Sequence, residues 1–97
     1  MGKANEIIDW CEWGMLLRTA RILNGYSSAS ALVTDLHKRT GLTLSARSIY
    51  AFEEGEHVPS AEVWVGLQML LPELRDPERL RPVFKQGGVK VVLVELK

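Results

Sequence analysis

The sequence has little of the chemistry that most enzymes and secreted proteins need. It contains one cysteine, Cys11, and two histidines, His37 and His57. A single thiol excludes an internal disulfide and is typical of proteins of the reducing cytoplasm. These three residues lack the spacing of a metal site, and there is no phosphate-binding glycine loop or nucleophile elbow. We therefore expect no metal, no cofactor and no catalytic residue, and a protein that is not an enzyme.

Long apolar runs are also missing. No run approaches the roughly 18 residues that span a bilayer. Glu6 and Asp9 interrupt the first apolar segment, so we expect no secretory signal, no membrane association and a cytoplasmic location. The share of hydrophobic residues, 46%, is that of a globular chain rather than a disordered one. We expect a folded domain over residues 1–72 and an extension over residues 73–97.

Neither sign of charge is in excess, because twelve Lys and Arg residues balance twelve Asp and Glu residues. Zero net charge argues against indiscriminate binding to nucleic acid. The charges are unevenly spread, however. Between residues 18 and 48 the single acid Asp35 stands against Arg18, Arg21, Lys38, Arg39 and Arg47. Because phosphate contact depends on local cations, this part of the chain is suited to DNA if the acids that follow it, at 53, 54 and 56, face away.

Apolar residues recur at helical intervals in four segments of the chain. Serines stand at the expected starts of three segments, and glycine or proline stands at the expected ends. The predicted helices cover about residues 5–23, 28–40, 45–55 and 60–71, with a further helical turn at about 77–80. The fold class is therefore mainly α, a bundle of four to five helices.

The last residues change in character. Val89–Lys97 is rich in β-branched residues and follows two glycines, which predicts a strand, and Pro82–Lys85 would pair with it as a hairpin. Both faces of this strand are apolar, so the economical arrangement is pairing with the same strand of a second copy in a two-fold homodimer. Packing of the strand on its own helices is the alternative. The expected dimerisation residues are Val89, Val91, Val92, Leu93, Val94 and Leu96.

The third predicted helix has the most informative composition. Ile49 and Phe52 are three residues apart and are expected to form one buried stripe. Ala46, Arg47, Tyr50 and Ala51 then point elsewhere. A short helix that offers Arg47 and small residues from its first turns suits the DNA major groove, where arginine pairs with guanine. An ordinary surface helix is the alternative interpretation.

From about Trp13 to Leu71 the chain resembles the lambda-repressor-like helix-turn-helix family of Cro and XRE type. The specific part of the resemblance is the spacing of Ile49, Glu53, Gly55, Pro59 and Ser60. Weaker matches are Leu17–Gly25 with the family's first helix, and Ser28, Leu32, Val33 and Leu36 with its second helix.

The resemblance implies an ion pair between Arg21 and Glu53, which would tie the first helix to the end of the recognition helix. It implies contact with base edges by Ala46, Arg47, Tyr50 and Ala51. Contacts with the DNA backbone are expected from Ser28, Ser45 and Ser48, and from Lys38 and Arg39 if the longer turn brings them there.

The segment from His37 to Leu44 is longer than the usual family pattern. It could tilt the recognition helix, bring cations to the backbone, or mark loss of DNA binding. The expected function is a dimeric, sequence-specific transcriptional regulator, a repressor that binds a near-palindromic operator in double-stranded DNA. The alternatives are an antitoxin that neutralises a toxin partner and a protein-interaction module on a helix-turn-helix scaffold.

Overall fold

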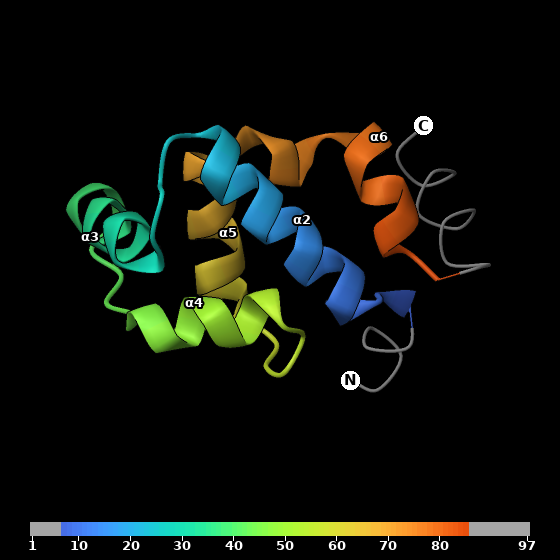
Figure 1. The fold of residues 1–97 in the computed structure, drawn as a ribbon, viewed down its shortest axis with the longest axis horizontal. Coiled ribbons are helices and arrows are strands. Elements are labelled where there is room, and N and C mark those ends of the chain that lie inside the picture. Colours follow the sequence, from blue (N-terminus) through green and yellow to red (C-terminus); the bar gives the residue numbers. More distant parts are fainter. Residues whose placement is uncertain (1–6, 86–97) are drawn as a thin grey trace.

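The computed structural model describes residues 7–85, and in this part of the chain the protein is mainly helical (Figure 1). The expected bundle is therefore confirmed at the level of a mainly α fold. Its helices are α2 (Trp10–Leu23), α3 (Ala29–Thr40), α4 (Ala46–Glu53), α5 (Ala61–Leu70) and α6 (Pro77–Leu80), with 3-10 turns η1 (Pro72–Arg75) and η2 (Arg81–Val83) on either side of α6.

Most helix ends lie where local chemistry predicts them. Ser28, Ser45 and Ser60 are N-caps, and each side chain accepts a hydrogen bond from the amide three residues further on. Gly41 and Gly55 end or follow a helix with φ of 81° and 77°, in the left-handed region that glycine adopts without strain. The predicted limits of α3, α4 and α5 are thus confirmed to within a few residues.

The first helix begins later than predicted. The side chain of Asp9 accepts hydrogen bonds from the amides of the first turn, so α2 starts at Trp10 rather than near Asn5. Ile8 precedes the helix and forms an antiparallel bridge with Phe84, flanked by a hydrogen bond of 2.7 Å from the Asp9 amide to the Val83 carbonyl. A tertiary pairing, absent from local periodicity, therefore removes this segment from the helix.

The first arm of the predicted hairpin is wrong. Pro82 and Val83 lie in η2, where the fixed φ of proline favours a helical start, and Phe84 pairs with Ile8 instead. Within residues 7–85 there is no strand beyond this isolated bridge. The predicted strand Val89–Lys97, with all of its dimerisation residues, lies outside the described residues.

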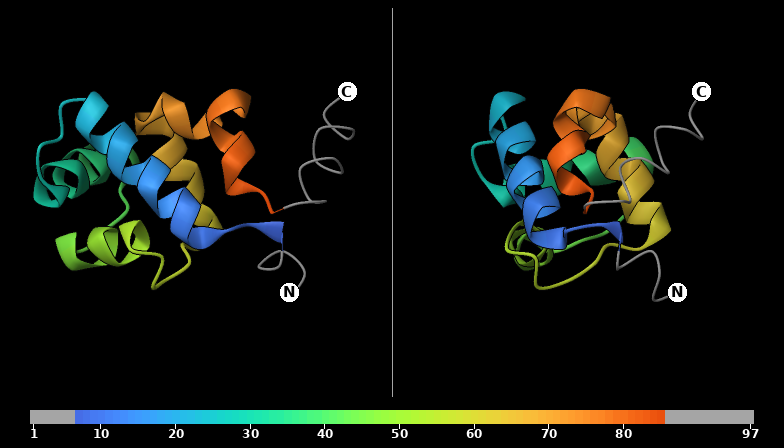
Figure 2. Two further views of the ribbon diagram at one scale, coloured as in Figure 1. Left: turned by 45° about the vertical axis from the view of Figure 1, so that its right-hand side comes forward. Right: turned by 90° about the vertical axis from the view of Figure 1, so that its right-hand side faces the viewer.

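The core lies between α2, α3, α4 and α5 and continues under α6. Figure 2 shows the α6 segment alongside α2, and Leu74 and Val83 are buried there, beyond Pro72. Fully buried large side chains are Trp13, Leu17, Leu32, Leu36, Ile49, Leu67, Leu71, Leu74 and Val83. The burial of these apolar groups is the main stabilising contribution to the bundle.

Three tryptophans join the beginning of α2 to α5. The rings of Trp13 and Trp64 are stacked with centroids 5.1 Å apart, and Trp10 packs edge-on against both, at 5.6 Å and 5.7 Å. Offset-stacked and edge-on contacts of this kind are the arrangements that aromatic pairs prefer. The cluster fixes α5 behind α2.

Helix α2 passes very close to the end of α4. A Cβ atom at Gly14 would lie 2.4 Å from the carbonyl oxygens of Phe52 and Glu53. These are backbone atoms that cannot rotate away, so only glycine allows the two helices to approach this closely.

We expect Gly14→Ala to lower the free energy of unfolding by about 1–3 kcal/mol or more, because overpacking against backbone outweighs the gain in helix propensity. Gly66→Ala is the control, since its Cβ would meet the flexible end of Leu42 at 2.6 Å. Urea unfolding followed by circular dichroism measures both variants. Equal losses of stability in the two variants would contradict the conclusion that only glycine allows α2 and α4 to approach this closely at position 14.

Candidate nucleic-acid interface

A buried ion pair anchors α4 to α2. The Arg21 Nε donates to Glu53 Oε2 at 2.6 Å and its Nη2 donates to Oε1 at 3.4 Å, while Nη1 donates to the Tyr26 carbonyl at 2.9 Å. Arg21 is 4% exposed and Glu53 is 9% exposed. The ion pair implied by the resemblance is therefore present, and it also holds the loop between α2 and α3.

The acidic cluster lies at the end of α4 away from Arg47. Arg21 neutralises Glu53, and Glu54 and Glu56 are exposed beyond the last turn of the helix. Arg47 stands in the first turn, so most of the 8-residue helix separates it from these carboxylates. The acids that weigh against DNA binding in the sequence are thus displaced from the arginine.

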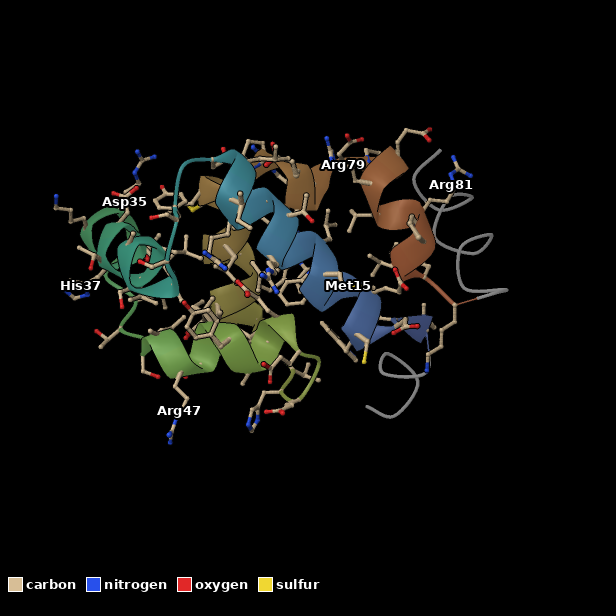
Figure 3. The ribbon with its side chains drawn as sticks, in the orientation of Figure 1. Met15, Asp35, His37, Arg47, Arg79 and Arg81 are labelled. Atoms are coloured by element: carbon tan, nitrogen blue, oxygen red, sulfur yellow. The ribbon has the colours of Figure 1, made fainter. Side chains whose placement is uncertain are left out.

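Arg47 projects from the bundle into solvent. Figure 3 shows its side chain pointing away from every other helix, and the residue is exposed. Within residues 7–85 no carboxylate forms an ion pair with it. Ser45 and Ser48 lie beside it at the helix start, where their hydroxyls are 3.1 Å apart, and Ala46 is half-buried. These residues present a small, polar surface around one free guanidinium.

Tyr50 and Ala51 differ in their exposure to solvent. The Tyr50 ring faces the Arg21 guanidinium at 5.7 Å, and its hydroxyl accepts a 3.3 Å hydrogen bond from the Ala29 amide at the start of α3. Tyr50 therefore joins α4 to α3 while 43% of the residue stays exposed, and its contact with bases stays a prediction. Ala51 is only 9% exposed, and its carbonyl accepts a hydrogen bond from the Glu56 amide in the loop after α4. Its assignment to base contact is corrected.

The predicted backbone-contacting residues separate into two groups. The first group, Ser28, Ser45 and Ser48, lies at the starts of α3 and α4. The Tyr50 hydroxyl of α4 contacts the start of α3. Arg39 instead pairs with Asp35 at 3.4 Å, and Figure 3 shows Asp35 on the far edge of α3 from Arg47. Lys38 lines a shallow hollow with the same Asp35. The structure does not bring these two cations to the Arg47 surface.

A cavity of about 340 Å³ lies between α2, the start of α3 and α4. It brings Arg18 and Ser27 next to Tyr50, and its other lining residues are Met15, Arg21, Glu53 and Glu54. Neither Arg18 nor Ser27 was among the predicted site residues. The spacing of Arg18 and Arg21, three apart on one helix, is the signal that could have placed Arg18 here.

The longer turn between α3 and α4 is held by contacts with α3 and with α5. The His37 Nδ1 lies 3.2 Å from the Leu42 carbonyl oxygen and 3.4 Å from the Thr43 hydroxyl. Leu42 packs over Gly66 of α5, where a Cβ atom would be only 2.6 Å from Leu42 Cδ1. The extra residues therefore form a fixed connection, and His37 is a contact that periodicity did not identify.

None of the helices within residues 7–85 combines the length and apolarity that crossing a bilayer requires. Among the same residues, no three side chains of His, Cys, Asp or Glu gather as a potential metal site.

Comparisons with protein-family models, with curated proteins and with solved structures find no match to this chain. Its function is therefore inferred from its own residues.

We expect Glu53→Gln to lower the free energy of unfolding by about 3–5 kcal/mol, because it leaves a buried guanidinium without its counter-charge. The double variant Arg21→Met with Glu53→Leu should lose less stability than the sum of the losses in Arg21→Met alone and Glu53→Leu alone. Urea unfolding measures the free energy of unfolding of each variant. Glu78→Gln is the control, since its pair with Arg81 is exposed and contributes about 0–1 kcal/mol. Additive losses in the cycle would contradict a coupled buried pair.

Tyr26 gives a prediction for alkaline pH. Burial, the hydrogen bond from its hydroxyl to Asp35 and the charge of Asp35 raise the pKa of Tyr26 above 10.0, while Arg39 lowers it. The folded state therefore favours the neutral phenol. Its contribution to stability is complete below pH about 10 and is lost as the pH rises through the folded-state pKa. The stability difference between the parent and Tyr26→Phe should shrink above that pH in urea titrations; a constant difference would contradict the coupling.

Proposed function

We propose that this chain is a sequence-specific DNA-binding regulator of transcription that acts as a dimer and represses by occupying an operator. The observation that carries the proposal is the position of Arg47. It is exposed and forms no ion pair within residues 7–85, and it projects from a helix whose other end is locked to the bundle by Arg21 and Glu53.

A fixed, unpaired arginine is suited to reading a base. Its planar guanidinium donates two parallel hydrogen bonds to guanine in the major groove, which is about 12 Å wide. An α-helix with its side chains is about 10–12 Å in diameter, so α4 can enter a groove of that width. Small side chains at Ser45, Ala46 and Ser48 leave room for the helix to approach the bases.

The starts of α3 and α4 supply the contacts that position the helix. Free amides and the helix dipole make a helix N-terminus attractive to phosphate. The hydrogen bond between the Ala29 amide and the Tyr50 hydroxyl fixes the start of α3 relative to α4. Ser28, Ser45 and Ser48 then contact phosphates on the strands that border the groove.

A dimer gives the proposed regulator enough sequence information. One short helix reads only a few base pairs, whereas two helices about 34 Å apart read both half-sites of a near-palindrome. The predicted strand Val89–Lys97 would join the two copies by strand pairing.

Selection of binding sites from a random duplex library by the full chain tests the proposal. We expect enriched duplexes to contain inverted half-sites spaced by about one helical turn. Absence of enrichment at low salt would contradict DNA binding and favour the protein-interaction module.

We expect Arg47→Ala to lose about 1–3 kcal/mol of discrimination at one base pair per half-site. Arg47→Lys keeps the charge but not the paired hydrogen bonds, so it should keep the salt dependence and still lose discrimination. Arg79→Ala is the matched control, because Arg79 is an exposed arginine on the opposite side of the bundle (Figure 3). Binding to the selected duplex and to a single-base variant measures all three. Retained discrimination in Arg47→Ala would refute the base-reading role.

A further inference from the structure

The turn that precedes α4 carries a histidine beside it. Residues 41–45 are all uncharged, so they offer DNA no charge of their own. His37, in the last turn of α3, lies against this turn through the contacts of its Nδ1 with the Leu42 carbonyl oxygen and the Thr43 hydroxyl. The side chain is exposed.

These contacts determine which ring nitrogen carries the proton. A carbonyl oxygen can only accept, so Nδ1 donates to Leu42 and is protonated in the neutral ring. The neutral ring then has a lone pair at Nε2 and cannot donate to a phosphate. Protonation adds an N–H at Nε2 and gives the ring a positive charge. Within residues 7–85 the hydrogen-bond contacts of the His37 ring are made through Nδ1 and not through Nε2.

His37 lies on the side of α3 that faces α4. Figure 3 shows it on the edge nearest α4, whereas Asp35 is on the opposite edge. Its contact residue Thr43 is two positions before Ser45, the N-cap of the helix that bears Arg47. The imidazole therefore flanks the proposed DNA-binding surface at the border where a phosphate strand would pass.

We propose that His37 is the phosphate contact of this turn, in place of Arg39, and that it makes the contact only in its protonated form. The inference rests on the proposed function and adds to it a dependence on pH. DNA binding then takes up one proton per subunit, because the phosphate favours the charged ring.

The charges around the imidazole agree with such coupling. Lys38 and Arg39 are its neighbours on α3, Arg47 projects into solvent from α4, and Glu62 of α5 lines the groove formed by Thr40–Leu42. Arg39 is engaged by Asp35, and within residues 7–85 no carboxylate forms an ion pair with His37. In the described part of the chain, a DNA phosphate would therefore not have to displace a carboxylate from His37.

Binding of the full chain to a selected duplex, measured by fluorescence anisotropy at pH about 5.5 and 7.5, tests the inference, because imidazole ordinarily changes charge near pH 6.5. Each added phosphate contact steepens the slope of log affinity against log salt by about 0.9, so the change is about 0.9 for each subunit of the dimer. The affinity lost between 50 and 200 mM salt should thus be about 3.5-fold larger per subunit at the lower pH.

Three variants separate His37 from other causes. His37→Gln should show the shallow slope at both pH values, and His37→Lys the steep slope at both. His57→Gln, which removes the chain's other histidine from an exposed loop, should keep the difference. A parent slope that does not change with pH, a pH-dependent slope in His37→Gln, or loss of the dependence in His57→Gln overturns the inference.

The proposed function fails separately from this inference. Arg47-dependent binding with the same slope at both pH values overturns the role of His37 alone. No binding to any duplex at either pH overturns the regulator itself.

Discussion

The buried pair of Arg21 and Glu53 determines how the rest of the molecule is arranged. Taking two charges out of water is costly, and the cost is recovered here because the guanidinium has hydrogen-bond acceptors on two sides, the carboxylate and the Tyr26 carbonyl. The same joint contains Gly14, whose missing side chain lets α2 touch the last carbonyls of α4. A charge contact and a steric contact therefore fix the last turn of α4, while Arg47 projects into solvent from its first turn.

Features that depend on neighbours in sequence could be predicted. Ser28, Ser45 and Ser60 cap helices because a short hydroxyl side chain satisfies amides within the same turn. Gly41 and Gly55 follow helices because few other residues accept a positive φ. The short helix Pro77–Leu80 follows from a capping aspartate and a proline in its first turn. Each of these features needs only a few consecutive residues.

Features that depend on distant parts of the chain could not be predicted. Phe84 pairs with Ile8 across most of the sequence, and Ala51 is buried although it lies outside the stripe of Ile49 and Phe52. Asp35 forms a local pair with Arg39 four residues on, but its hydrogen bond from the Tyr26 hydroxyl depends on how the loop before α3 folds back. The contact of Tyr50 with α3 could not be predicted for the same reason, since the start of α3 comes within reach of its hydroxyl only in the folded bundle.

The tryptophan cluster has an optical consequence. All three indoles of the chain lie with centroids within 6 Å of one another, so light absorbed by any of them is shared and emitted from one place, the junction of α2 and α5. That junction is not part of the surface around Arg47. A change in the protein's intrinsic emission when a partner occupies that surface would therefore indicate a rearrangement at the junction of α2 and α5.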